Sequence, residues 1–296
     1  MSAALLLLPD FLLIALGAAL ARSRSFGAPF WSGVERLVYY VLFPALLFRS
    51  LATAPLAIGD ALPLVGVGIA STTTGALLAL VARPLFAMPQ PVFAACFQCA
   101  FRFNTYVALA TASRVAGTAG VASISLLIGV LVPLVNIAAV AMLARGGDTR
   151  FLPALVRNPL VLACVAGIAW HAGDWPVPAL PARVLELLAA AALPLGLLAV
   201  GAGLRIERGT LSAATIAWFH AVKLGAVPAV AWALAHALGL GPVERQVAVI
   251  MAAVPTATSA YIRAMQMNGA GAPVALLISS GTLVAAVTLP LWIAVA

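Results

Sequence analysis

Two short stretches of this 296-residue chain place polar and cationic residues inside otherwise apolar segments. The first, FRFNTYVALA, brings together Arg102, Asn104 and Thr105. The second, PTATSAYIR, supplies a proline, two threonines, a serine and a cation, namely Pro255, Thr256, Thr258, Ser259 and Arg263. Amides, hydroxyls and guanidinium groups all donate hydrogen bonds. The chemistry that both stretches indicate is therefore the binding of an anion.

The spacing of these residues indicates that each stretch interrupts a helix. Asn104 lies 13 residues after Pro91, and Pro255 lies 13 residues after Pro242. A proline breaks a helix, and an asparagine side chain can bond its own backbone and favour a similar break. Half-helices then present free N–H groups and positive dipole ends, which suit an anion. The alternative is that Asn104 and Pro255 only shape helix packing.

The elements that hold these residues are expected to be membrane helices. Of all residues, 64% are hydrophobic and only 8% are charged, whereas a soluble domain has about 25% charged residues. Apolar runs of about 20 residues, enough to span a bilayer, recur along the chain. We predict an all-α integral membrane protein with ten spans, at 4–21, 35–53, 61–82, 91–112, 120–143, 153–171, 183–203, 211–238, 243–268 and 272–295.

Residues 1–145 and 151–296 are predicted to form two repeats of five helices each. Landmark residues recur at an offset of 150 in the pairs Pro9 and Pro159, Gly17 and Gly167, and Pro44 and Pro194. Because five is odd, the second repeat enters the membrane from the opposite side. Inverted repeats of this kind are a signature of secondary transporters.

The basic residues predict the orientation. Nine arginines fall in the loops on one side and four on the other, and the richer side should be cytoplasmic. Both termini are then expected on the outer side of the cell membrane. The run 3–21 lacks a preceding basic region, so we interpret it as a first membrane helix rather than a signal peptide. The net charge of +8 comes from dispersed arginines, which do not indicate a nucleic-acid partner.

Two further polar residues, His220 and Lys223, lie inside the predicted span 211–238. A charge at bilayer depth usually faces a cavity or a partner. A lysine removed from water can also lose its proton, so Lys223 is a candidate for proton coupling, with His220 on the same helix face. Alternatively, Lys223 tethers a broken helix by donating to free carbonyls, and His220 is a satisfied polar group.

No cofactor, metal or enzymatic activity is expected. Cys96 and Cys99 form a CxxC pair, but no second pair and no histidine accompany it, so buried free thiols are the simpler interpretation. The chain has no HExxH pair, and its His, Asp and Glu residues are too scattered for a metal or acid–base site.

Four stretches resemble the auxin efflux carrier family: Pro9-Asp10-Phe11 to Gly17, ERLVYYVLFPALLF, FRFNTYVALA and VPTATSAYIRAMQMNGA. That family includes plant auxin carriers and shorter bacterial and fungal transporters, some for malonate or malate. The resemblance implies a fold like that of bile-acid symporters. Helices 1, 2, 6 and 7 would form a scaffold domain, and helices 3–5 and 8–10 a transport domain. The broken helices 4 and 9 would cross at the substrate site.

The match to the family motif is incomplete. In plant members a proline precedes the crossover asparagine, whereas here Phe103 does, and only Asn104 and Thr105 carry over. The long loop of many plant members is absent, so regulation through it and auxin itself as substrate do not carry over.

These features together predict a secondary transporter of a small organic anion, a mono- or dicarboxylate, that works by elevator-type alternating access. Asn104 and the hydroxyls near Pro255 would bind the anion, and Arg102 and Arg263 would add positive potential. The expected partners are the anion, protons, the lipid bilayer and a second copy of the chain. Two alternatives stay open, a sodium-coupled symporter of the bile-acid type and a membrane receptor that does not transport.

Overall fold

A computed structural model describes residues 3–53, 62–143, 158–204, 211–266 and 270–296. All secondary-structure elements of this described part are helices, and it contains no strand. With its apolar composition, this makes the chain an all-α membrane protein. Five helical stretches are long and apolar enough to cross a membrane: Leu62–Leu85, Gln90–Leu143, Ala179–Ala202, Ala213–Ala237 and Gly271–Val295. The other predicted spans fall on shorter or interrupted helices, so the number ten stays a prediction.

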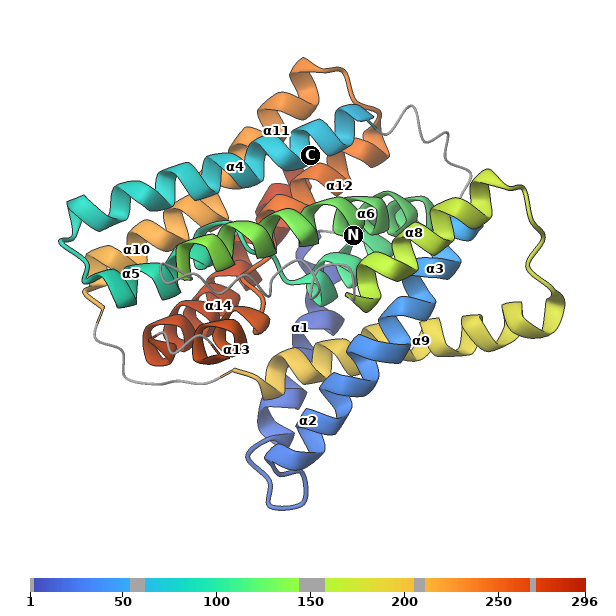
Figure 1. Cartoon of the computed structure of the whole chain (residues 1–296), viewed down its shortest axis with the longest axis horizontal. Coiled ribbons are helices and arrows are strands. Elements are labelled where there is room, and N and C mark those ends of the chain that lie inside the picture. Colours follow the sequence, from blue (N-terminus) through green and yellow to red (C-terminus); the bar gives the residue numbers. More distant parts are fainter. Residues whose placement is uncertain (1–2, 54–61, 144–157, 205–210, 267–269) are drawn as a thin grey trace.

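One group of helices packs together at the right and bottom of Figure 1. It consists of α1 (Ala3–Leu20), α2 (Ala28–Leu37), α3 (Phe43–Ala52), α8 (Pro159–Ala172) and α9 (Ala179–Ala202). Helix α1 packs on α9, and α3 packs on both α8 and α9. A π-helical turn, η1 (Val38–Leu42), joins α2 to α3. Helix α8 begins where the Asn158 side chain accepts the Leu160 N–H at 3.0 Å, as an N-cap residue does.

Glycines let these helices approach closely. A methyl group at Gly17 of α1 would collide with the carbonyl oxygen of Leu198 in α9. A methyl group at Gly167 of α8 would lie 2.9 Å from the carbonyl oxygen of Phe48 in α3. Small residues are common at such contacts because membrane helices associate through close packing. The two contacts are equivalent, since Gly167 and Leu198 lie 150 residues after Gly17 and Phe48.

A second group of helices occupies the left and top of Figure 1. It consists of α4 (Leu62–Leu85), α5 (Gln90–Phe97), η3 (Gln98–Ala100), α10 (Ala213–His220), η4 (Ala221–Ala226), α11 (Val227–Ala237), α12 (Pro242–Ala253), α13 (Ser259–Gln266) and α14 (Gly271–Val295). Helix α11 packs on α4 and α12, and α12 packs on α14. Ser212 caps the start of helix α10, since its hydroxyl accepts the Thr215 N–H at 3.2 Å.

Helix α6 (Thr105–Leu143) contacts both groups, because it packs on α12 and also on α3 and α8. It bends at Gly117, whose φ of 57° is a conformation that glycine adopts without a steric penalty. Just before this bend, the Arg114 guanidinium forms an ion pair with Asp10 of α1 at 2.7 Å.

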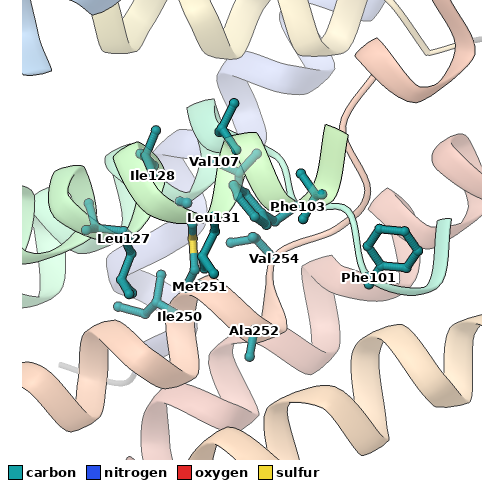
Figure 2. Close-up of a cluster of buried hydrophobic side chains, with 14 of the residues drawn as sticks. Phe101, Phe103, Val107, Leu127, Ile128, Leu131, Ile250, Met251, Ala252 and Val254 are labelled. Atoms are coloured by element: carbon teal, nitrogen blue, oxygen red, sulfur yellow. The ribbon is translucent and has the colours of Figure 1, made fainter. Parts of the chain in front are cut away.

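A buried apolar cluster supports the centre of the molecule. Figure 2 shows Leu127 and Leu131 of α6 facing Ile250 and Met251 of α12, with Ile128 on the other side of α6. Phenylalanines from the segment between η3 and α6 extend the same cluster. The cluster therefore lies directly against the non-helical segments that interrupt the helices.

Candidate functional site

Both stretches that the sequence singles out are breaks between helices. Residues 101–104 separate η3 from α6, and residues 254–258 separate α12 from α13. The side-chain oxygen of Asn104 accepts the N–H groups of Tyr106 at 3.0 Å and Val107 at 3.3 Å. Asn104 therefore caps the start of α6 and satisfies N–H groups that a helix start leaves free.

The two breaks are hydrogen-bonded to each other. The Asn104 N–H donates to the Pro255 carbonyl at 2.8 Å, the Thr256 hydroxyl to the Cys99 carbonyl at 2.8 Å, and the Gln98 amide to the Ala260 carbonyl at 3.1 Å. Irregular backbone at membrane depth is stable only where protein or a water-filled cavity satisfies it. Here each break supplies groups that satisfy the other.

A cavity of about 730 Å³ lies beside the breaks. Six residues that the sequence predicts for a binding site line it: Arg102, Asn104, Thr105, Thr258, Ser259 and Arg263. The opposite walls come from α2 and η1, from the start of α8 and from the C-terminal third of α6. The cavity therefore lies between the two groups of helices.

Two guanidinium groups converge on one neutral oxygen in this cavity. Arg102 donates to the side-chain oxygen of Asn136 at 2.7 Å, and Arg263 donates to the same oxygen at 3.4 Å. Arg102 also donates to the side-chain oxygen of Gln98 at 3.0 Å. Arg102 and Asn136 are each only 6% exposed. Two buried or half-buried positive charges thus share one acceptor, the Asn136 oxygen, that carries no charge.

The charge balance of the cavity wall is positive. Arg36 lines the cavity in addition to Arg102 and Arg263, and among the described lining residues Glu35 is the carboxylate. Glu35 and Arg36 follow one another in α2, at the wall of the cavity. Fixed charges in a cavity walled by protein are screened less than charges at a surface.

The remaining predicted residues lie outside the cavity lining. The Thr256 hydroxyl and Pro255 carbonyl take part in the contacts between the breaks. The Lys223 ammonium, in η4, donates to the Ala252 carbonyl at 2.5 Å, in the last turn of α12 before the break. The His220 ring forms a hydrogen bond of 2.8 Å with the Ser280 hydroxyl.

Within the residues that the structure describes, no three His, Cys, Asp or Glu side chains group so that they could hold a metal ion. The sequence-based prediction missed Asn136 and Tyr39, which also line the cavity. For Asn136 a signal was present, since it is a lone amide in the apolar run 120–143, and polar residues inside a membrane helix are commonly functional.

Comparisons with known proteins find similarity to membrane transport proteins. The family described as membrane transport protein matches residues 148–293 of the chain. A protein of Rhizobium meliloti (strain 1021) named "Putative malonate transporter" is 28% identical over 279 residues, which cover 88% of this chain and 85% of that protein. The chain is thus similar to a relative over nearly its whole length.

Proposed function

We propose that this chain, a member of the auxin efflux carrier family of membrane transport proteins, is a secondary transporter of a small organic anion. The observation that carries this proposal is the convergence of Arg102 and Arg263 on the neutral oxygen of Asn136. Neither guanidinium has its charge neutralised by that acceptor. A carboxylate entering the cavity can form the charge-assisted hydrogen bonds that the amide oxygen cannot.

A mono- or dicarboxylate fits the donors that the breaks supply. Asn104 uses its side-chain oxygen to cap α6, which leaves its NH2 group to donate to a ligand. The hydroxyls of Thr258 and Ser259 and the first turn of α6 at Thr105 line the same cavity. The similar Rhizobium meliloti protein is named for malonate, which makes malonate the first substrate to test.

The proposed architecture is ten spans in two inverted repeats whose broken helices cross at the site. Asn104 and Pro255 lie 13 residues after Pro91 and Pro242, and their backbones are hydrogen-bonded directly. The equivalent glycine contacts of α1 with α9 and of α8 with α3 also support a two-fold relation between the halves.

The two groups of helices support an elevator-type movement. The group of α1, α2, α3, α8 and α9 corresponds to the proposed scaffold, and the group around the breaks corresponds to the proposed transport domain. Because the cavity lies between them, sliding one group along the other would expose the anion to each side in turn. The positive-inside distribution of arginines supports a cell-membrane protein with both termini outside. A cysteine introduced at Gly147 should therefore react with a membrane-impermeant label from the cytoplasmic side only, and labelling from outside would contradict this orientation.

Lys223 is proposed to support the second break. Its ammonium bonds the Ala252 carbonyl, which has lost its helical partner because the helix ends at Ala253. The charge so placed stabilises the end of α12 without contacting the substrate cavity.

The experiment that tests the function is uptake of labelled malonate by the purified protein in proteoliposomes, with protein-free liposomes as the control. Uptake that increases with an inward proton gradient would establish a proton-coupled carrier. Uptake that ignores the gradient would indicate a uniporter or exchanger, and a sodium requirement would favour the bile-acid type of symporter. Binding of malonate without uptake would indicate a receptor. The proposal would be refuted if the protein neither bound nor took up malonate, malate, succinate or acetate.

A further inference from the structure

We propose that Asn136 sets the charge selectivity of the cavity, by holding two guanidinium groups together without neutralising them. This inference rests on the proposed anion transport. Asn136 lies on α6 and belongs to neither break. Its side-chain oxygen is nonetheless the acceptor that Arg102 of the first break and Arg263 of α13 share.

The hydrogen bonds around Asn136 form a closed ring. From Asn136 the ring passes through Arg102 to Gln98, and the Gln98 amide donates to the Ala260 carbonyl of α13. Arg263, on the same helix as Ala260, donates back to Asn136. Every acceptor in the ring is an amide or a backbone carbonyl. The ring therefore fixes the positions of two cations and leaves their charges without a counter-ion inside it.

An amide at position 136 leaves the two arginines charged and available, whereas a carboxylate there would not. An aspartate has the same shape and would accept the same two hydrogen bonds more strongly. It would also place a negative charge between the arginines and occupy them as an internal counter-ion. An amide keeps the geometry and leaves the charge for the ligand, so Asn136 acts as a positioning residue through Arg102 and Arg263.

The test compares Asn136→Asp with Asn136→Ala in the full-length purified protein. The measurements are thermal unfolding and the Kd for malonate and for its monomethyl ester. We expect Asn136→Asp to unfold like the wild type but to bind malonate at least about tenfold more weakly, since a full charge a few ångströms away acts strongly in a protein interior. The loss should be smaller for the ester, which carries one charge fewer. Asn136→Ala, which adds no charge, should bind malonate better than Asn136→Asp.

If the role of Asn136 were purely structural, Asn136→Asp would bind malonate better than Asn136→Ala. Aspartate would then preserve both hydrogen bonds and bind like the wild type, whereas alanine would lose stability and affinity. That order would overturn the inference while leaving anion transport intact. Arg263→Gln is a second variant that leaves Asn136 unchanged. We expect it to weaken malonate binding more than ester binding, and equal affinity to the wild type for both would also overturn the inference. A wild-type protein that binds no carboxylate would instead contradict the proposed function itself.

Discussion

Replacing Asn104 tests two roles of one side chain, the helix cap that the structure shows and the substrate contact that we propose. The oxygen caps α6 through the N–H groups of Tyr106 and Val107, and the NH2 group is proposed to bind the substrate. Asn104→Ala removes both. Loss of the cap should lower the free energy of unfolding by about 0.5–2 kcal/mol. A hydrogen bond to a charged ligand contributes about 1.5–3 kcal/mol, so the Kd for malonate should rise by about 10- to 150-fold.

Two further variants separate these contributions. Asn104→Asp keeps an oxygen that can cap α6 but replaces the donor by a negative charge, so it should retain stability and lose binding. Ser212→Ala removes the cap of α10, where the hydroxyl accepts the Thr215 N–H, and Ser212 does not line the cavity. It should lower stability by about 1 kcal/mol and leave the Kd unchanged.

The assays are thermal unfolding in detergent and equilibrium binding of labelled malonate on the same preparations. If Asn104→Asp binds malonate as tightly as the wild type, the amide donor is not used, and Asn104 serves only as a helix cap. If Ser212→Ala raises the Kd as much as Asn104→Ala does, the effect on binding comes from general destabilisation.

Three other predictions concern positions behind the cavity. Gly17→Ala should destabilise the protein by about 1–3 kcal/mol through overpacking, whereas Gly66→Ala, in α4 with open space around it, should not; thermal unfolding compares the two. Lys223→Met should slow malonate uptake and leave the Kd for malonate within about twofold of the wild-type value. Normal uptake would show that the ammonium is dispensable. Thr256→Val should cost about 1–3 kcal/mol of stability by leaving the buried Cys99 carbonyl without its donor, which chemical denaturation would measure; no change would mean that another group satisfies this carbonyl.

The sequence predicted the breaks because they depend on local chemistry. Pro255 cannot donate a backbone hydrogen bond, and the Asn104 side chain bonds N–H groups two and three residues ahead. Both effects can be recognised from residue type and position. The cations Arg102 and Arg263 were recognised for a similar reason, since a charge inside an apolar run stands out.

What the sequence could not predict depends on contacts between distant segments. The ion pair of Arg114 with Asp10, for example, joins residues 104 positions apart. The π-helical turn that carries Tyr39 to the cavity is not encoded in a recognisable local pattern. The proposed role of Asn136 likewise depends on two arginines from other segments of the chain.

The mutual hydrogen bonds of the two breaks also bear on how the chain is made. During synthesis the first half enters the membrane before the second half exists, so the carbonyl of Cys99 has no Thr256 hydroxyl to accept. A polar group unsatisfied in the bilayer costs several kcal/mol. The first half on its own should therefore insert less stably into the membrane and be degraded more readily by quality-control proteases. Maturation of the first half thus waits for residues translated about 150 positions later, and the two halves, expressed as separate chains, should protect each other from degradation.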